Sequence, residues 1–318
     1  MLSSTSPLIS IIVPAYNVAI YIGEALQSVV EQDFENYEII VINDGSTDTP
    51  DLELALEPFG DRIVYLQQPN GGISAARNAG LRVARGELIA LLDSDDIWLP
   101  GKLTEQLEFM RSGDYDMVYA DALLFGEIQW PEGTTFMDRS PSNGPVTLLS
   151  LLDLQATPVV STVIMRKDLV LKAGCFDESD RTIPEDYDLW LRMVQVGARI
   201  GYQQKPLAKY RYRSDSLSAS RVKLHSGALR VLQKARRDMK LSPEELAALS
   251  KTEQRLQSTI TIENSKDMIV KGEVDAAASM LSQARESNKS WKIPVALFLL
   301  RTFPGLLRNY LRRTHQPH

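Results

Sequence analysis

The stretch Leu88–Pro100, LIALLDSDDIWLP, joins an apolar run to three carboxylates within four positions. Its first residues, Leu88–Leu92, have the length and composition of a buried strand, and Asp93, Asp95 and Asp96 follow at once. An apolar strand that ends in clustered acids indicates a sheet edge at which the negative charge has a function. The residues at the neighbouring strand ends indicate which function this is.

Short apolar runs alternate with stretches of helical period over the first part of the chain. This alternation predicts an α/β protein with a mostly parallel central sheet flanked by helices. The expected strands are Ile9–Val13, Glu38–Ile42, Ile63–Leu66, Leu88–Leu92, Met117–Ala120, Val159–Met165, Ile200–Gln203 and Ala208–Tyr212, and the first expected helices are Ile20–Gln32 and Ser74–Ala84. Strand signals stop near Arg221, and capped amphipathic helices are expected beyond it. The predicted segments are therefore residues 1–221, a helical extension 222–290 and a C-terminal segment 291–318.

Composition excludes several classes of protein. The 318 residues are 44% hydrophobic and 24% charged, as in ordinary globular proteins, and the net charge of −6 argues against a nucleic-acid partner. Cys175 is the single cysteine, so an internal disulfide is impossible and a reducing compartment is expected. The N-terminus lacks a basic segment, and its apolar run is too short for a signal peptide, which favours a cytoplasmic protein. The three histidines come late in the chain, which makes a zinc site improbable.

Three early strands end in polar residues. They are followed by Pro14-Ala15-Tyr16-Asn17, by Asn43–Asp48 and by Asp93–Asp96. In an open parallel sheet the carboxyl ends of the strands form the ligand site, and their convergence favours binding over simple turn formation. Asp93 and Asp95 are suited to a hard divalent cation that carries a nucleotide diphosphate. A carboxylate at Asp44 equally suits hydrogen bonds from a base or a ribose.

A glycine pair precedes one of the expected helices. Gly71-Gly72 would allow a close turn, and the first turns of the helix present Ser74, Arg77 and Asn78. Amide donors and a guanidinium group at that position suit a phosphate.

These motifs, taken in order, resemble the inverting family 2 glycosyltransferases, which have the Rossmann-like GT-A fold. The resemblance covers about Ile9 to Ser220. It rests on SIIVPAYN (10–17), SVVEQDFENYEIIVINDGSTD (28–48), NGGISAARNAGL (70–81), GELIALLDSDDIWLP (86–100) and EDYDLWLRM (185–193).

The resemblance implies roles on the donor side of the reaction. It assigns Asp44 to uracil, Arg77 to the nucleotide, and Asp95 with Asp93 to a Mn²⁺ or Mg²⁺ ion. The other residues that it places around the nucleotide sugar are Pro14, Ala15, Tyr16, Asn17 and Ser94.

On the acceptor side, the resemblance assigns the pair Glu185-Asp186, with Asp186 as the catalytic base. Inverting transfer is a single displacement, so a carboxylate must accept the proton of the attacking hydroxyl. The alternative is that both acids only begin the helix Tyr187–Val196, where the helix dipole favours them. At Arg213 the chain departs from the family, many of whose members have a histidine there. An arginine does not ligate a metal, but its fork suits a diphosphate.

We expect a metal-dependent transferase that moves a sugar, from UDP in preference to other nucleotides, to a hydroxyl of a glycan or lipid-linked acceptor. The sugar and the acceptor are left open. A non-catalytic module that binds sugar nucleotides, or a nucleotidyltransferase that makes them, is the alternative. The first expected loop, VPAYNVAIYIG (13–23), lacks the basic residues typical of nucleotidyltransferases. A phosphotransfer enzyme with a nucleophilic aspartate is disfavoured because the strand-end acids lack an accompanying lysine.

The C-terminal segment has a composition of its own. Residues 291–318 contain five Lys or Arg and no Asp or Glu, so the rest of the chain carries a formal charge of −11. A stripe at helical spacing, ending at Tyr310 and Leu311, has two interpretations: ordinary core, or peripheral contact with an anionic membrane through 291–313. Pro304-Gly305 should divide the segment into two short helices.

Overall fold

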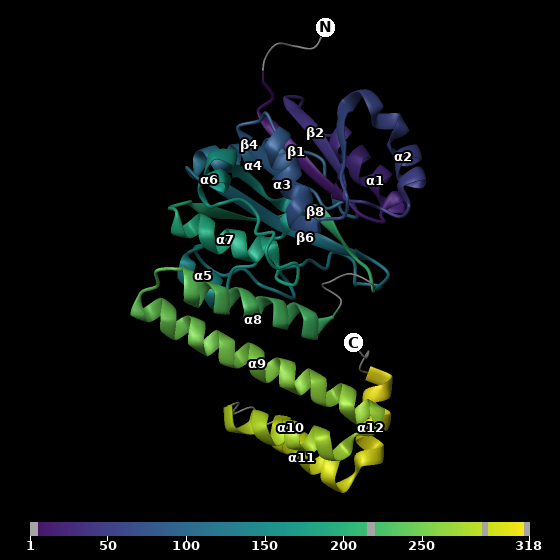
Figure 1. Cartoon of the computed structure of the whole chain (residues 1–318), viewed down its shortest axis with the longest axis vertical. Coiled ribbons are helices and arrows are strands. Elements are labelled where there is room, and N and C mark those ends of the chain that lie inside the picture. Colours follow the sequence, from purple (N-terminus) through teal and green to yellow (C-terminus); the bar gives the residue numbers. More distant parts are fainter. Residues whose placement is uncertain (1–5, 215–219, 288–291, 315–318) are drawn as a thin grey trace. The chain divides into compact units, whose positions relative to one another are not determined.

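The computed structural model describes residues 6–214, 220–287 and 292–314 (Figure 1). It divides into two compact units, residues 1–213 and 214–318. The predicted boundaries near residues 221 and 290 remain a prediction. Trp291 and residues 315–318 of the C-terminal segment lie outside the described residues.

The first unit is built on one sheet of eight strands in the order β3-β2-β1-β4-β7-β6-β8-β5. The strands are β1 (Ile9–Ala15), β2 (Tyr37–Asn43), β3 (Ile63–Gln67), β4 (Leu88–Leu91), β5 (Ile97–Trp98), β6 (Met117–Gly126), β7 (Ile164–Arg166) and β8 (Ile200–Tyr212). The half formed by β1 to β4 is entirely parallel, as predicted. The other half is mixed, because β7 runs antiparallel to β4 and β6, and β5 antiparallel to β8.

Helices cover this sheet as the alternation predicts. They are α1 (Ala19–Val30), α2 (Thr49–Leu56), η1 (Glu57–Arg62), α3 (Ile73–Val83), α4 (Lys102–Ser112), α5 (Leu148–Leu152), η2 (Val160–Thr162), α6 (Lys167–Lys172) and α7 (Glu185–Gln195). Alternate residues of β1 point to opposite faces, so Ile11 and Val13 join the core cluster that includes Ile22 of α1. Ile12 faces α3, where a Cβ added at Gly80 would lie 2.8 Å from its side chain. Only glycine therefore permits this close packing.

Three predicted strands differ from the observed ones. The stretch Val159–Met165 begins as the short helix η2, and only Ile164–Arg166 forms a strand. Thr162 within η2 donates its hydroxyl to Ala120 O at 3.0 Å and so makes a polar contact that hydrophobic patterning does not register. Ile200–Gln203 and Ala208–Tyr212 form the single strand β8, whose pairing with β6 is irregular near Asp121.

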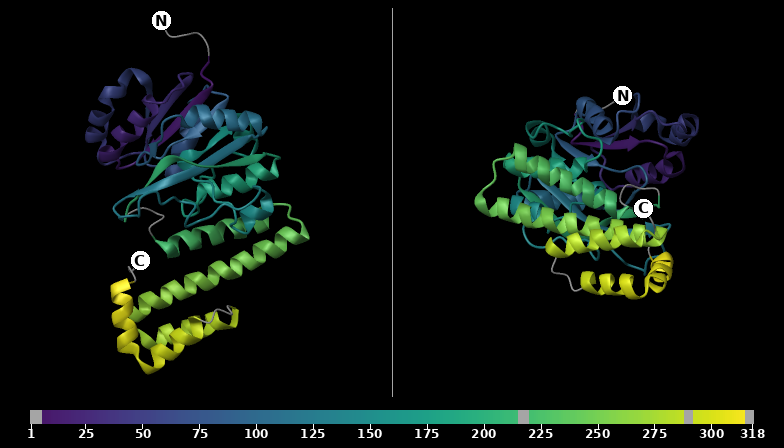
Figure 2. Two further views of the ribbon diagram at one scale, coloured as in Figure 1. Left: turned by 180° about the vertical axis from the view of Figure 1, so that it is seen from behind. Right: turned by 60° about the horizontal axis from the view of Figure 1, so that its bottom comes forward.

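The second unit, within its described residues, is helical (Figure 2). It contains α8 (Arg221–Asp238), α9 (Pro243–Lys271), α10 (Val274–Ser287), α11 (Lys292–Thr302) and α12 (Pro304–Thr314). The break between α11 and α12 lies at the predicted Pro304-Gly305 position. A small core joins Ile269, Leu281, Leu297 and Leu311 from α9 to α12. Among the described residues, every helix falls short of the length or apolarity that a bilayer crossing requires.

Candidate active site

The carboxyl ends of β1, β2 and β4 meet at one edge of the sheet. Ala15 pairs with Asn43, and Leu91 pairs with Ile12, which brings the acids after β4 to the same level. The residues after β1 are joined to those after β2, because Asn17 Oδ1 accepts hydrogen bonds from the Thr47 N–H at 2.8 Å and its hydroxyl at 3.0 Å. Asn17 has a φ of 55°, a left-handed conformation that asparagine tolerates well.

The residues that precede Asn17 differ in exposure. Pro14 and Ala15 are buried at the end of β1, whereas Tyr16 is 49% exposed beside them. Tyr16 thus presents a ring to solvent at the edge where a nucleotide base is predicted to bind.

Asp44 anchors the glycine turn. Its Oδ1 accepts hydrogen bonds from Gly71 N at 2.8 Å and from Gln68 Nε2 at 2.7 Å, and its Oδ2 accepts one from Gly72 N at 2.8 Å. Three donors on a buried carboxylate give Asp44 a structural task that the sequence does not reveal. Gly72 has a φ of 86°, which explains a glycine at that position.

Arg77 connects the predicted metal side with the predicted acceptor side. This residue is 2% exposed, and its Nη2 lies 2.7 Å from Asp93 Oδ1 while its Nη1 donates to Glu185 Oε1. Burial alone would lower the pKa of the Arg77 guanidinium, but the carboxylates of Asp93 and Glu185 raise it above its ordinary value. Arg77 is therefore a fixed positive charge between two acids that are 92 positions apart in the chain.

A buried serine braces the acidic turn after β4. Ser161 Oγ accepts a hydrogen bond from Asp93 N at 3.1 Å and donates to Asp96 Oδ2 at 2.5 Å. Its carbonyl accepts from Trp98 Nε1 at 2.6 Å. Ser94 is buried within this turn, so its hydroxyl does not face an open surface. Ser161 was not among the predicted site residues, because no motif surrounds it in the sequence.

Arg211 of β8 and Arg213, which follows the end of that strand, complete the acidic edge. Arg213 Nη1 lies 3.1 Å from Asp95 Oδ2, and its guanidinium stacks over the Tyr21 ring at 4.9 Å. Arg211 donates from Nε to Asp95 O at 2.7 Å, and its backbone N–H donates to Asp96 Oδ1 at 2.8 Å. Burial and the neighbouring Asp93 raise the pKa of Asp95, although Arg213 acts in the opposite direction.

Glu185 and Asp186 occupy the first turn of α7. Burial, followed by the adjacent charge of Glu185, raises the pKa of Asp186 to about 7, and Arg77 opposes this rise. A carboxyl group with this pKa exchanges its proton near neutral pH, which is the property required of a general base.

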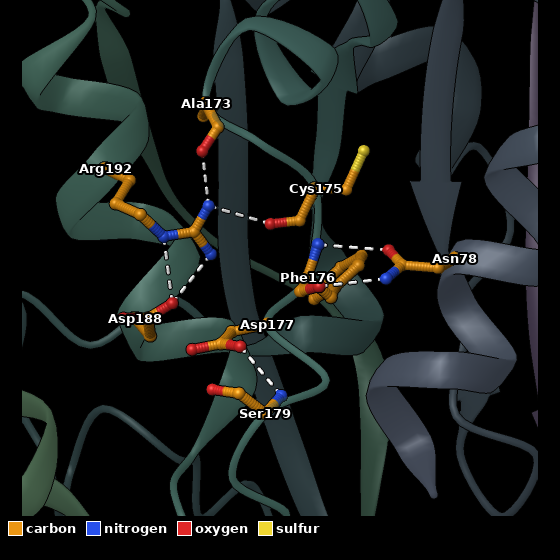
Figure 3. Close-up of polar contacts among 8 residues, drawn as sticks. All are labelled: Asn78, Ala173, Cys175, Phe176, Asp177, Ser179, Asp188 and Arg192. Atoms are coloured by element: carbon orange, nitrogen blue, oxygen red, sulfur yellow. Dashed lines mark hydrogen bonds and ion pairs between the residues drawn. The ribbon is translucent and has the colours of Figure 1, made fainter. Parts of the chain in front are cut away.

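The segment that leads to α7 is held by the buried side chain of Asn78 and the partly buried side chain of Arg192 (Figure 3). Asn78 of α3 donates from Nδ2 to Phe176 O at 2.8 Å, and its Oδ1 accepts from Phe176 N at 3.0 Å. Arg192 donates to Cys175 O at 2.8 Å and pairs with Asp188 at 2.7 Å. The second amide hydrogen of Asn78 goes to Glu178 Oε1, so its amide serves this segment and not a phosphate. Here the expectation for Asn78 was wrong.

The network has an excess of negative charge. Its guanidinium groups are those of Arg77, Arg211 and Arg213, and its carboxylates are those of Glu24, Asp93, Asp95, Asp96, Glu185 and Asp186, so the formal excess is three negative charges. Among the described residues, no group of three or more His, Cys, Asp or Glu side chains has metal-binding geometry. A cation here would need diphosphate and water oxygens in addition to Asp93 and Asp95. The residues present fit one divalent ion on these terms.

A mixed sheet whose parallel edge carries this network defines a GT-A glycosyltransferase fold, and comparisons with known proteins agree. The family model "Glycosyl transferase family 2" matches residues 10–167. TuaG of Bacillus subtilis, named as a teichuronic acid biosynthesis glycosyltransferase, is 30% identical over 233 residues, which are 70% of this chain and 86% of TuaG. The chain belongs to glycosyl transferase family 2.

Other matches differ in extent. An uncharacterized glycosyltransferase of Rickettsia felis is 32% identical over 234 residues, which are 71% of this chain but only 37% of that protein. This chain thus spans about a third of the length of that relative.

Two solved structures confirm the predicted fold. Staphylococcus aureus TarS 1–349 in complex with UDP-GlcNAc has a TM-score of 0.61 and 17% identity, over 98% of this chain and 93% of that one. The mannosyltransferase PcManGT of Pyrobaculum calidifontis, in complex with GDP-Man and Mn²⁺, has a TM-score of 0.64 and 20% identity, over 97% and 86%.

Proposed function

We propose that this chain transfers a sugar from a nucleotide-diphosphate sugar, with a UDP-sugar as donor, to a hydroxyl of a glycan or lipid-linked acceptor, and inverts the anomeric centre. The observation that carries the proposal is the buried link through Arg77 between Asp93 and Glu185, with Asp186 beside it. This link holds a donor-side acid and an acceptor-side acid in one rigid frame. A displacement reaction needs that frame, because attack and departure occur on opposite sides of one carbon.

The donor nucleotide would bind at the edge formed by Pro14, Ala15, Tyr16 and Asn17. The exposed ring of Tyr16 offers a stacking surface for a base. Asp44 already accepts three hydrogen bonds, so its contribution to uracil would come through the remaining capacity of Oδ2 and through the turn that it holds. The structure of TarS in complex with UDP-GlcNAc supports a UDP-sugar as the donor to test first.

Asp93 and Asp95 would hold Mn²⁺ or Mg²⁺ together with the donor diphosphate. When bound, the ion supplies positive charge that stabilises the departing diphosphate. Arg213 would contribute a second positive group on the same side, since its fork already lies 3.1 Å from Asp95. Ser94 would keep the turn between the two acids compact.

Asp186 would accept the proton of the acceptor hydroxyl as that oxygen attacks the anomeric carbon. Glu185 would act through Arg77 and through its charge on Asp186, and so would position the base and adjust its pKa. The hydroxyl proton moves to the Asp186 carboxylate. The bond between the anomeric carbon and the diphosphate oxygen breaks as the new glycosidic bond forms.

The proposal is tested by measuring the release of nucleoside diphosphate from UDP-, GDP- and TDP-sugars, with Mn²⁺, Mg²⁺ or excess EDTA. We expect release from a UDP-sugar that requires the ion. Product analysis by NMR should show an inverted anomeric configuration. Full turnover in EDTA would contradict the metal assignment, and turnover with GDP-sugars alone would contradict the assignment of Asp44.

The alternative functions predict different outcomes of the same assay. A non-catalytic module would bind UDP without releasing it from a sugar. A nucleotidyltransferase would consume a sugar phosphate and a nucleoside triphosphate. The ordered base and metal-side acids favour the transferase over both.

We also propose a cytoplasmic protein that contacts the inner face of the cell membrane through residues 291–313, where a lipid-linked acceptor would be available. TuaG is named as a teichuronic acid biosynthesis glycosyltransferase, and this supports a role in polysaccharide biosynthesis. In this proposal residues 1–221 are the catalytic domain and 222–290 the helical extension that carries the contact segment.

A further inference from the structure

The second unit contains a cavity of about 600 Å³ between α10 and α11. Its lining includes Ser282, Arg285, Leu297, Phe298, Arg301 and Thr302. No acidic side chain lines it among the described residues. The cavity lies outside the predicted active site, and the sequence motifs do not include it.

Two exposed guanidinium groups dominate the polar character of the cavity. Arg285 comes from α10 and Arg301 from α11, so the two positive groups reach it from different helices. The hydroxyl of Ser282 donates to Ala278 O at 2.7 Å, and that of Thr302 donates to Phe298 O. Because both hydroxyl hydrogens are used within their own helices, an anion in the cavity would be bound by the arginines. Paired guanidinium groups are suited to phosphate oxygens.

Apolar side chains are exposed along residues 295–310 of α11 and α12, and Phe298 among them lines the cavity. Phe298 is 62% exposed and Leu306 is 70% exposed, and Val295, Phe303 and Tyr310 are also exposed. Leu300 and Leu311 are buried in the core of the unit, and Leu297, which also lines the cavity, belongs to the same core. The exposed apolar residues are therefore not part of the core of the unit. Exposed apolar surface of this kind is unusual in a protein that is surrounded only by water.

The charges near these exposed apolar residues indicate what kind of partner would cover them. The described part of residues 293–312 contains Arg301, Arg308 and Arg312 and no acidic residue. Arg308 is used internally, because its Nε donates to Val270 O at 3.0 Å at the end of α9. Arg301 and Arg312 remain exposed. Exposed aromatic and aliphatic side chains beside exposed arginines are typical of helices that lie in a membrane interface.

We propose that this cavity binds the phosphate of an anionic phospholipid headgroup, held between Arg285 and Arg301, while Phe298, Phe303 and Leu306 enter the acyl boundary. The inference rests on the proposed membrane contact and gives it a ligand and a binding site. A free phosphate would contact the two arginines but would leave Phe298, Phe303 and Leu306 exposed to water. An anionic bilayer would contact the arginines through its headgroups and bury the apolar side chains.

The test measures binding of the full chain to vesicles of phosphatidylcholine with phosphatidylglycerol, and to vesicles of phosphatidylcholine alone, by co-sedimentation. We expect binding to the anionic vesicles only. Arg285→Gln and Arg301→Gln should each weaken it at least tenfold. The matched control Arg312→Gln removes an exposed arginine outside the cavity lining and should weaken it no more than about fivefold, the effect of one interfacial charge.

A second measurement follows insertion directly. In the variant Phe298→Trp, tryptophan emission should shift to shorter wavelength with anionic vesicles, and 10 mM inorganic phosphate should not reverse the shift. Equal losses for Arg301→Gln and Arg312→Gln would overturn the cavity assignment. Displacement by inorganic phosphate would indicate a free-phosphate site instead, and a wild-type protein that ignores both vesicle types would overturn the proposal.

UDP binding by each variant, measured by calorimetry, keeps this proposal separate from the proposed enzymatic function. We expect it to be unchanged in all of them, because the cavity residues belong to the second unit. If the wild type binds vesicles but no nucleotide, the proposed function fails while the phospholipid site stands.

Discussion

At the residue scale, side chains that were expected to touch a ligand also hold the frame of the site. Asp44 secures the turn at Gly71-Gly72, and Arg77 joins Asp93 to Glu185. A buried arginine with two carboxylate partners loses both ion pairs when it is replaced, so substitution at Arg77 would damage folding and function together. Asp186 and Arg213 are better positions for separating chemistry from structure.

Replacing Asp186 with Asn should lower turnover by roughly 10²–10⁴-fold while UDP binding persists, because the amide retains the shape but accepts no proton. In the wild type, the pKa of about 7 means that the base is protonated below neutrality, so kcat/KM should rise with pH through that value. The rise should be absent from Asp186→Asn. Steady-state rates between pH 5.5 and 8.5 measure both effects.

A matched control is Asp168→Asn, which removes an exposed acid from the first turn of α6. It should leave the rate unchanged. If Asp186→Asn behaves in the same way, Asp186 is only a helix-terminal acid. A parallel loss of UDP affinity would show that it shapes the nucleotide pocket.

Arg213→Ala should change two affinities in opposite directions. Without its guanidinium group Asp95 loses a competing positive charge, so Mn²⁺ should bind the nucleotide-free protein about two- to fivefold more tightly, as expected for a partly exposed ion pair. UDP in the presence of Mn²⁺ should bind roughly tenfold more weakly, because a charged hydrogen bond to the diphosphate is lost. Calorimetry with the metal alone and then with UDP separates the two.

The control for this experiment is Arg199→Ala, an exposed arginine paired with Asp114. Neither affinity should change there. Unaltered Mn²⁺ affinity in Arg213→Ala would mean that the ion does not use the Asp95 oxygen that Arg213 contacts.

At the scale of elements, short polar anchors decide where the functional turns lie. Ser161 in η2 fixes both ends of the Asp93–Asp96 turn, and Asn78 in α3 fixes Phe176 ahead of α7. Both anchors are buried and both join elements that are distant in the chain. The acidic turn after β4 and the segment before α7 are thus each held by a neighbouring element as well as by their own.

Ser161→Ala should reduce the free energy of unfolding by about 1–3 kcal/mol, because the buried Asp93 N–H and Asp96 carboxyl lose their partner. UDP affinity with Mn²⁺ should fall as well, since the turn that presents Asp95 loosens. Urea denaturation and calorimetry provide the two values. Ser112→Ala, which removes an exposed hydroxyl bonded to its own helix, should change neither. Loss of stability with full UDP affinity would show that the turn does not depend on this brace.

At the scale of the whole molecule, each unit has its own core, and the predicted site residues all lie in residues 1–213. Some residues of the apolar stripe in the C-terminal segment belong to the core, and others are exposed. Leu311 is 8% exposed and belongs to the core, whereas Phe303, Leu306 and Tyr310 are exposed. Arg308 is used within the unit, because its Nε donates to Val270 O near the end of α9.

Truncation after Ser290 should therefore destabilise the second unit. It removes Ile293, Leu297 and Leu300 from the core and leaves Leu281 exposed, at a cost of about 1.5–3 kcal/mol for each lost side chain. Binding of a hydrophobic dye and an earlier unfolding transition in urea should report this. Leu306→Ser, on the exposed side, should leave the transition in place. A truncated protein with an unchanged transition would show that α11 and α12 do not contribute to the core.

The sequence by itself determined the α/β class, the parallel strands β1 to β4, and the acids at their carboxyl ends, because hydrophobic period and turn residues are local signals. It also identified the family through ordered motifs. Only the tertiary structure decided which acid meets which arginine. Arg77 and Glu185 are 108 positions apart, Asp95 and Arg213 are 118 apart, and no local pattern records such pairs. For the same reason the mixed half of the sheet, the brace at Ser161 and the two sides of the C-terminal stripe became visible only when distant elements packed together.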